Sequence, residues 1–244
     1  MFASSNNVKY IFRNVKSSII KSNYHIAIGW RWLITVGDSE KLIVIHDSIL
    51  PKYRGFNPLV TALINGDKQI GATILYGAKD FDMGDIIAQE ILNIEYPLSI
   101  YEAINKVSEL YCLLLNKVLR GISSNSVLEV TSQNPEEGNY SLWRDEEDYH
   151  IDWNQDAERI NRFIDSVGFP YKGACCYYEG DLIRIIKTSV VPDLNVSNRV
   201  PGKLILKKDD MPVIICGSGL LMIEKAKCEN GDRVIFKNYR IRLK

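Results

Sequence analysis

The chain has 244 residues, of which 46% are hydrophobic, and 30 basic side chains balance 30 acidic ones. This length is enough for one large domain or two small domains with a hydrophobic core. A formal net charge of zero argues against a protein whose main task is to bind nucleic acid, because such proteins usually carry a basic excess.

The termini and the cysteines indicate a compartment. No apolar run approaches the length that spans a bilayer. Residues 1–7 lack the charged start and the long apolar stretch of a signal peptide. The five cysteines are odd in number and form no C-x-x-C pair, which suggests neither a disulfide framework nor a metal site. We therefore expect a soluble cytoplasmic protein with no membrane partner and no bound metal.

The first half of the chain alternates short apolar runs with helical patterns, which is typical of a parallel α/β layer. Strands are expected over residues 24–28, 42–45 and 72–76. A helix is expected between the last two strands. Asn57 is a favourable cap for it, Pro58 suits its first turn, and Gly66 follows its end.

A second helix and a linker follow. Ser99 and Glu102 form a capping box, which predicts the start of a long helix that runs to about Leu119. Residues 122–137 are rich in Ser, Asn and Glu and contain a proline, so we place a linker there. The linker separates a first domain of residues 1–121 from a second domain of residues 138–244.

The second domain opens on a helix and continues in short strands. Asp156 is the expected cap of this helix, which continues through Val167 and ends at Gly168. The expected strands cover residues 175–178, 182–188, 203–206, 213–216, 220–225 and 234–243. Short strands at regular spacing predict a small open barrel.

His46 is the first candidate for chemistry. It stands just past the carboxyl end of the expected 42–45 strand, where open α/β sheets place their ligand crevices. A histidine at such a place can titrate near neutral pH and move protons. A structural histidine that bonds a neighbouring loop is equally compatible with this position.

An acidic loop supplies the second candidate. Residues 80–85 contain three aspartates and follow the expected 72–76 strand. If the two strands run parallel, their ends bring Asp82 next to His46, and a carboxylate beside an imidazole fixes its orientation. The alternative is an ordinary turn, because Asp and Gly are common turn residues.

A pair of tryptophans is the third candidate. Trp30 and Trp32 follow the first expected strand and could wall a pocket for a flat ring. The alternative is that they anchor a loop to the core.

Together these segments resemble the 10-formyltetrahydrofolate-dependent formyltransferases. In that family a strand ends in Asn-x-His, followed by Ser-Leu-Leu-Pro and often Arg-Gly, then by Gly-x-Thr and Asp-x-Gly-Asp. The matching segments here are His46–Gly55, Gly71–Thr73 and Asp82–Asp85, while Asp152-Trp153 and Pro170–Ala174 look like the opening of the small barrel found in several members. Order and spacing both agree, and the resemblance covers roughly residues 24–220.

The resemblance implies a fold and a reaction. The fold is α/β: a Rossmann-like parallel sheet with a shortened N-terminal half, followed by a small OB-like β-barrel domain. The reaction is direct transfer of the formyl group of 10-formyltetrahydrofolate to an amine, without a metal. His46 would move a proton and support the oxyanion, and Asp82 would hold the histidine or an ordered water. Pterin contacts, mostly through the backbone, would fall on Trp32, Leu33, Ile34, Ala78, Lys79, Asp80 and Phe81.

The sequence departs from the family pattern in two places. The family asparagine two positions before the histidine is Val44 here, so one oxyanion donor is missing, and losing such a donor costs about a hundredfold or more in rate. Either His46 or a backbone amide compensates, or the protein is slow, or it is not an enzyme. Asn57 is the nearest spare amide, but it suits the helix cap better. In addition, only 23 residues precede the Tyr24 strand, so we expect either that the binding of the acceptor is rearranged or that the start of the sequence is truncated.

The likeness is strongest to the sugar N-formyltransferases, which act on nucleotide-linked amino sugars. Such a protein would serve surface glycan, flagellin or nonulosonic acid synthesis, and a homodimer is compatible with it. The residues expected to contact this substrate are Asp47, Ser48, Arg54 and Trp143. The main alternative is methionyl-tRNA formylation, which zero net charge and the short N-terminal half disfavour. The sequence is also compatible with a folate-binding protein without catalysis, and with hydrolysis of formyltetrahydrofolate.

Overall fold

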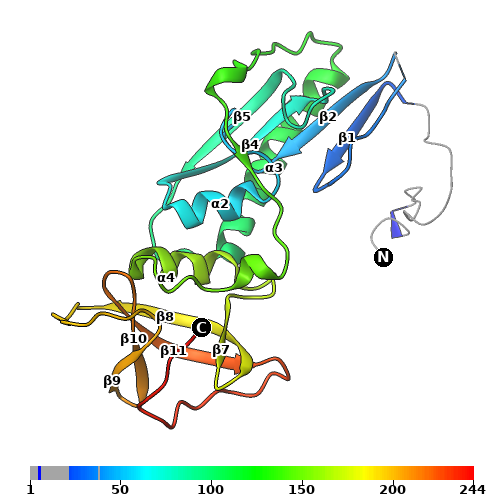
Figure 1. The fold of residues 1–244 in the computed structure, drawn as a ribbon. Coiled ribbons are helices and arrows are strands. Elements are labelled where there is room, and N and C mark those ends of the chain that lie inside the picture. The colour runs from blue at the N-terminus through cyan, green and yellow to red at the C-terminus, as the bar shows by residue number, and fades with distance from the viewer. Residues whose placement is uncertain (1–4, 7–21, 38) are drawn as a thin grey trace.

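A computed structural model describes residues 5–6, 22–37 and 39–244 of the chain (Figure 1). The described chain forms two lobes, an upper one built on a mixed sheet and a lower one built on a curled sheet, with α4 between them. Most of the N-terminal segment before Tyr24, including most of the stretch tested for a signal peptide, lies outside the described residues.

The elements follow one another in the expected order. The first lobe contains β1 (Tyr24–Ile28), β2 (Lys41–His46), β3 (Arg54–Gly55), α2 (Pro58–Asn65), β4 (Gln69–Tyr76), β5 (Ile86–Asn93) and α3 (Ile100–Ser123). The connecting segment and the second lobe contain η1 (Pro135–Glu137), β6 (Tyr140–Ser141), η2 (Glu147–Tyr149), α4 (Ala157–Ser166), β7 (Cys175–Tyr178), β8 (Asp181–Val191), β9 (Leu204–Lys208), β10 (Met211–Ile215) and β11 (Leu220–Cys228). The sequence did not predict β5.

The first sheet has the strand order β1-β2-β4-β5. Only β1 and β2 run parallel, whereas β4 is antiparallel to both β2 and β5. The expectation that the strands before His46 and Asp82 run parallel was therefore wrong. The connection through α2 starts and ends at the same end of the sheet, which places Thr73 of β4 opposite His46. The sequence could not show this, because apolar runs alone carry no information about strand direction.

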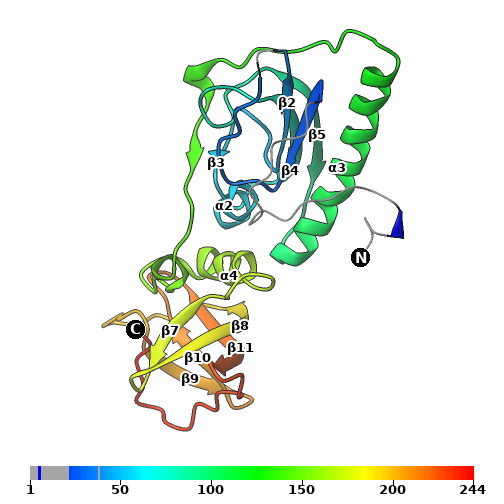
Figure 2. The same ribbon diagram turned by 90° about the vertical axis from the view of Figure 1, so that its right-hand side faces the viewer.

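Helix α3 covers one face of this sheet, and β3 lies on the opposite side (Figure 2). Its start is fixed by the expected capping box, in which Ser99 and Glu102 exchange side-chain and backbone bonds. Its buried residues recur every three to seven positions, as one face of a helix requires: Ile100, Ala103, Val107, Leu114 and Val118. One hydrophobic cluster continues from this face through α2 and α4 into the second lobe.

The second lobe is an antiparallel sheet of order β7-β8-β11-β10-β9, which confirms the expected combination of an α/β layer with a small curled sheet. Residues 234–243, expected as a strand, contain a single isolated bridge, at Arg242. The end of the chain instead joins the two edges of the sheet: the Leu204 amide donates to Ile241 and the Tyr177 amide donates to Lys244. A chain shared between two edges cannot keep one regular register.

The expected linker is attached to the first lobe. Thr131 exchanges backbone bonds with Ile86, and β6 pairs with β3 in parallel. Helix α4 begins at the cap formed by Asp156, as expected. Within the described residues, we find no helix with the length and apolarity needed to cross a membrane.

Candidate active site

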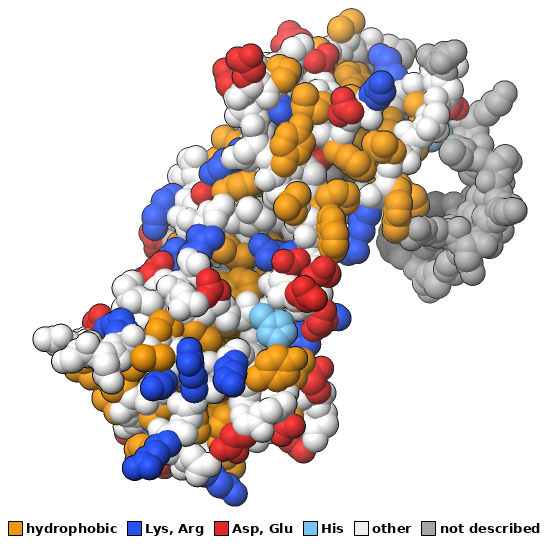
Figure 3. Space-filling view, in the orientation of Figure 1, with side chains coloured by type: hydrophobic (Ala, Val, Ile, Leu, Met, Phe, Trp, Pro, Cys, Tyr) orange, Lys and Arg blue, Asp and Glu red, His pale blue; other side chains and the backbone are white. Residues whose placement is uncertain are grey.

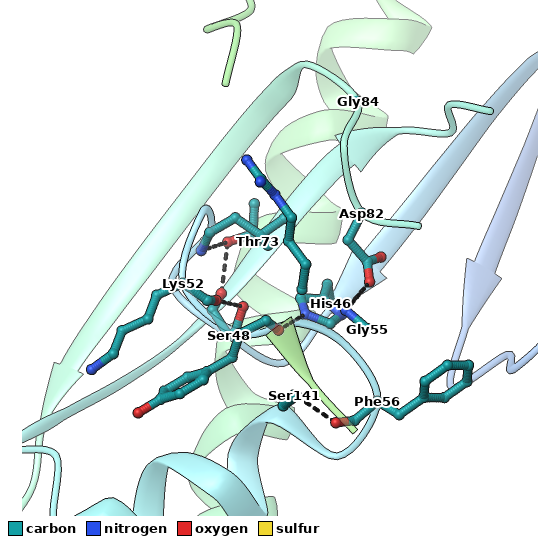
Figure 4. A network of polar contacts seen from close by, with 12 residues as sticks. His46, Ser48, Lys52, Gly55, Phe56, Thr73, Asp82, Gly84 and Ser141 are labelled. Carbon is teal, nitrogen blue, oxygen red and sulfur yellow. Dashed lines mark hydrogen bonds and ion pairs between the residues drawn. The ribbon is translucent and has the colours of Figure 1, made fainter. Parts of the chain in front are cut away.

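A short loop after β2 carries the site, and side chains of β4 and β5 fix its shape (Figure 4). The Ser48 hydroxyl donates to the Lys52 carbonyl at 2.7 Å, and the Thr73 hydroxyl donates to the Ser48 carbonyl at 2.7 Å. Gln89 of β5 donates to Thr73 at 2.8 Å and to the Leu50 carbonyl at 2.9 Å. Ser48 is 4% exposed and its hydroxyl is engaged within the loop. Ser48 therefore helps to fix the shape of the loop, and its expected contact with the substrate stays a prediction.

His46 lies at the end of β2 and is 6% exposed. Its Nε2 is 2.8 Å from the Tyr53 carbonyl oxygen, which can only accept, so Nε2 carries a hydrogen. Its Nδ1 lies 3.6 Å from the Oδ2 of Asp82. Both ring nitrogens thus face oxygen acceptors, an arrangement that fixes the plane of the ring and accommodates the doubly protonated imidazolium.

Asp82 is brought to His46 by the β4–β5 loop, which folds back over the sheet (Figure 4). Its Oδ2 accepts a bond from the Gly55 amide at 2.8 Å. Its backbone has a φ of 57°, an arrangement that Asp tolerates better than most residues. Gly84 is required in the same loop, because a Cβ there would overlap the Tyr76 carbonyl oxygen. The loop geometry, and not strand direction, brings the expected pair together.

Gln133 joins this loop to the rest of the site, and no sequence pattern singled it out. Its Nε2 donates to the carbonyls of Asp82 at 2.8 Å and Gly84 at 2.7 Å. Its Oε1 accepts from Arg54, from Nε at 3.1 Å and Nη2 at 2.9 Å. Gln133 falls in the polar stretch interpreted as a linker, where composition cannot distinguish a half-buried residue with several hydrogen bonds from a solvated one.

Arg54 was expected to bind the substrate, but its side chain is fully buried at 0% exposure. Besides Gln133, its guanidinium donates to the carbonyls of Asn134 and Pro135, both at 3.3 Å. A guanidinium surrounded by these acceptors has no free face for a ligand. Arg54 instead fixes the segment after α3 against the site, because a buried cation is retained only where hydrogen bonds satisfy it.

A pocket opens beside Asp82 and gathers the expected pterin contacts. It is lined by Ala27, Trp30, Trp32, Leu33, Ile34, Leu42, Val44, Leu75, Tyr76, Gly77, Ala78, Asp80, Phe81 and Asp82. Six of the seven residues expected to hold the donor are in this lining, and Lys79 is the one outside it. Trp30 and Trp32 pack edge to face at 5.2 Å, and Phe81 packs against Phe56 at 5.4 Å. Aromatic walls and loop backbone can together hold a flat heterocycle.

Val44 lines the same pocket. An aliphatic side chain therefore stands where the family pattern has an amide. Asn57, the nearest spare amide, occupies the position before α2, but its side chain makes no cap bond and its φ is 49°. The interpretation of its side chain as a helix cap was wrong, because the left-handed backbone turns it away from the first turn of the helix. Asn57 thus keeps an amide free of the cap.

Asp47 follows His46 and is half-buried. Its carboxyl lies near the Tyr111 hydroxyl of α3. Burial raises the pKa of the Asp47 carboxyl, while the neighbouring His46 and the Tyr111 hydroxyl act in the opposite direction. The same pairing and burial raise the pKa of Tyr111. Its role toward the substrate remains a prediction.

Trp143 is 60% exposed and lies two residues beyond the end of β6. The Ser141 hydroxyl of β6 donates to the Phe56 carbonyl, and the Phe56 amide donates to the Ser141 carbonyl at 3.0 Å. Gly55 has a φ of 93°, and a Cβ there would lie 2.8 Å from the Ser141 oxygen. This close approach places the segment that carries Trp143 beside the amide that holds Asp82.

Within the described ranges, no group of three or more metal-ligating side chains is assembled. What the site offers is an oriented imidazole and a carboxylate beside an aromatic pocket.

Two family models match the chain. Residues 33–119 match the formyl transferase model, and residues 144–240 match the formyl transferase C-terminal domain model. The chain belongs to the formyltransferase family. The two matches cover both lobes of the chain, including Asp82, most of the pocket lining beside it and the whole second sheet.

The names of similar proteins indicate different acceptors. A methionyl-tRNA formyltransferase of Alkaliphilus oremlandii is 31% identical over 82% of this chain and 63% of its own length. The structure of a 4-N formyltransferase from Francisella tularensis is 27% identical over 66% of this chain and 68% of that chain, with a TM-score of 0.56. An N-formyltransferase from Helicobacter canadensis, in complex with folinic acid and dTDP-3-aminofucose, is 18% identical over 96% and 81% of the two chains, with a TM-score of 0.63.

These comparisons differ in what they establish. The chain spans just under two thirds of the length of this curated relative. The likeness to the Helicobacter structure, at 18% identity, shows the fold alone. The family is thus established, while the acceptor is a separate question.

Proposed function

We propose that this chain transfers the formyl group of 10-formyltetrahydrofolate to the amine of a nucleotide-linked amino sugar. The observation that carries the proposal is the His46–Asp82 pair, held at 3.6 Å, with Asp82 in the lining of an aromatic pocket. Surface glycan, flagellin or nonulosonic acid synthesis is the setting that suits such a product. The five free cysteines fit a reducing cytoplasm.

The pocket beside Asp82 suits the formyl donor. A pterin is flat and carries several donors and acceptors on its edge. The segments 30–34 and 77–82 offer aromatic side chains and loop backbone from two sides of one hollow. A donor bound there would present its formyl group toward the rim that Asp82 occupies. The folinic acid in the Helicobacter protein is a ligand of the same chemical class.

The pair can carry out the proton movements of acyl transfer. The acceptor nitrogen bonds to the formyl carbon, the carbonyl oxygen gains negative charge, and the bond between that carbon and N10 of the folate breaks. A proton leaves the attacking nitrogen, and N10 takes one up. His46, with Nε2 donating to Tyr53 and Nδ1 facing Asp82, is oriented to hold this proton between the two steps. Its cationic form would also stabilise the oxyanion.

The charge distribution favours a small acceptor. At the junction of the two lobes, acidic side chains gather on the face shown in Figure 3. The run Asp145-Glu146-Glu147-Asp148 begins two residues after Trp143, lies in the chain between β6 and α4, and has three exposed carboxylates. A long row of phosphates laid across this junction would meet like charges. A nucleotide-linked sugar carries only two phosphates and needs few local contacts.

Methionyl-tRNA is the second candidate acceptor. The observation that favours it is the 31% identity to the Alkaliphilus protein, over 82% of this chain. Against it stand the balanced charge of the chain and the acidic junction.

A direct assay decides between the acceptors. The full chain is incubated with 10-formyltetrahydrofolate and a panel of nucleotide-linked 3-amino and 4-amino sugars, and mass spectrometry measures the mass of each sugar. We expect one panel member to gain the mass of a formyl group. Charged initiator tRNA is assayed in parallel at low salt. Formyl-methionyl-tRNA without any sugar product would replace the proposal with the second candidate, and tetrahydrofolate and formate without either product would indicate hydrolysis.

A further inference from the structure

A second pocket lies where the two lobes meet, outside the donor pocket. It is lined by Ile64, Arg144, His150, Ile151, Asp152, Gln155, Arg159, Ile160 and Phe163. These residues come from the end of α2, the chain after β6, and the first turns of α4. Its floor is apolar and its polar residues include two arginines and a histidine, a composition that suits an anionic ligand with an apolar part.

The two arginines of this pocket are available to a ligand. Both are half-buried, and neither side chain forms an ion pair or a hydrogen bond with any residue that the structure describes. The Nε of Arg144 is buried and has no hydrogen-bond partner. A buried N–H of a guanidinium without an acceptor costs free energy, because it has lost its water and gained nothing in return. The orphaned Nε of Arg144 therefore indicates an acceptor that arrives from outside the chain.

The one carboxylate of the pocket does not neutralise these arginines. Asp152 accepts from the amide and the side chain of Asn154 at 3.0 and 2.9 Å, and from Gln155 at 2.8 Å. The bonds from Gln155 and Asn154 hold the pKa of Asp152 below its usual value, so it stays ionised. Against one such charge, Arg144 and Arg159 leave the pocket with a positive balance. His150 is stacked on Tyr177 at 5.4 Å and completes the polar wall.

The pocket is within reach of the active site. Ser141 adjoins Gly55, whose amide holds Asp82, and Arg144 follows Ser141 by three residues. Three residues of extended chain span at most about 11 Å, and Trp143 lies between the two points with 60% of its surface exposed. In a nucleotide-linked sugar the diphosphate joins the sugar to the nucleoside, so one molecule can place its amine near Asp82 and its phosphates at Arg144.

We propose that this pocket binds the diphosphate of the nucleotide-linked acceptor through Arg144 and Arg159. Guanidinium groups pair with phosphate oxygens through parallel N–H bonds, which supply the acceptor that the Arg144 Nε lacks. This assignment rests on the proposed function and deepens it, because it names the residues that select a nucleoside diphosphate. The acidic run 145–148 beside the pocket disfavours a long polyanion, whereas a nucleoside diphosphate brings only two phosphates to the two arginines.

The test measures binding without catalysis. Titration calorimetry on the full chain uses inorganic pyrophosphate, UDP, dTDP and GDP as probes. We expect at least one nucleoside diphosphate to bind, and pyrophosphate to compete with it. Arg144→Gln and Arg159→Gln should each weaken this binding at least tenfold, whereas Arg144→Lys should retain part of it. Arg240→Gln, which removes an exposed arginine of the barrel outside the pocket, is the matched control and should bind as the unaltered chain does.

Binding of 5-formyltetrahydrofolate and circular dichroism verify that each variant is folded with an intact donor pocket. The assignment is wrong if the unaltered chain binds none of these diphosphates, which can be measured without any variant. It is also wrong if Arg144→Gln binds them as well as the unaltered chain does. If the arginines bind diphosphates but no sugar of the panel is formylated, the result supports the binding pocket and contradicts the proposed acceptor. If Arg144→Gln formylates a sugar with the same KM as the unaltered chain, the result supports the proposed function and contradicts the assignment of the pocket.

Discussion

The Nδ1 of His46 lies 3.6 Å from the Oδ2 of Asp82, although the strands that precede them run antiparallel. The loop after β4 folds back over the sheet and delivers the carboxylate to the end of β2. Two fixed points hold it there: the Gly55 amide on the carboxylate and Gln133 on the loop backbone. The imidazole is held independently by the Tyr53 carbonyl.

Removing either member of the pair should abolish formyl transfer. We expect His46→Ala and Asp82→Ala each to lower kcat by about 10²–10⁴, the usual contribution of a positioned proton-transfer group. Asp82→Asn removes the charge but keeps the shape of the side chain, because an amide oxygen can still accept the hydrogen bond from Gly55. We expect this variant also to lose most of its formyl-transfer activity. Initial rates with the formylated product as readout check this. Folded protein with near-normal turnover would remove that residue from the mechanism.

Gln133 should act on the site through the loop that carries Asp82. Gln133→Glu keeps an acceptor for Arg54 but loses the two N–H bonds to the carbonyls of Asp82 and Gly84. We expect a kcat at least tenfold lower, with stability changed little because the buried guanidinium remains paired. Gln133→Leu leaves Arg54 without two of its bonds and should cost about 1–3 kcal/mol in the free energy of unfolding.

Urea unfolding and initial rates distinguish the two Gln133 variants. A Gln133→Glu variant with unaltered kcat would show that the loop keeps Asp82 in place without these bonds.

Replacing Val44 with the family asparagine should bring no large gain. Val44 lies in the apolar wall of the donor pocket, and we expect the amide of Asn57 to supply the missing oxyanion donor, since it makes no cap bond. Val44→Asn should therefore leave kcat within about threefold or lower it. Asn57→Asp, which tolerates the same left-handed backbone, should lower kcat at least tenfold. A strong rate increase in Val44→Asn would instead show that the natural chain is impaired for lack of the amide.

Asp165 should make stability fall as the pH rises. Burial first, and repulsion by Glu102 second, raise the pKa of this carboxyl from 3.8 to about 6, while Lys187 opposes the shift. The folded state therefore binds the proton more tightly than the unfolded state. The contribution of this group to the free energy of unfolding is therefore highest below pH 4. It falls by about 2–3 kcal/mol as the pH rises from 4 through 6, at 1.36 kcal/mol per pKa unit.

Asp165→Asn should remove this decline, so that the variant gains stability at pH 7 and none at pH 4. Asp181→Asn, at an exposed position, is the matched control. Denaturant unfolding at several pH values measures both. A decline of equal size in Asp165→Asn would assign the effect to other groups.

The sequence alone predicted most features that depend on local chemistry, although the side-chain cap expected from Asn57 did not form. The cap by Asp156 and the capping box of Ser99 formed as expected, because each needs only neighbours a few residues away. The motif around His46 and the acidic loop predicted the family and six of the residues that line the donor pocket. Such motifs work because the chemistry restricts both residue type and spacing.

The tertiary structure alone decided the direction of β4 and the hydrogen-bond partners of the polar side chains. Strand direction in β4 depends on how α2 packs, and apolar periodicity is the same for either direction. Arg54 and Ser48 carry polar groups typical of binding sites, but their partners come from backbone carbonyls that are invisible in a sequence. Gln133 and the arginines at Arg144 and Arg159 acquire their surroundings only when distant segments meet, because burial and pairing are properties of the packed chain.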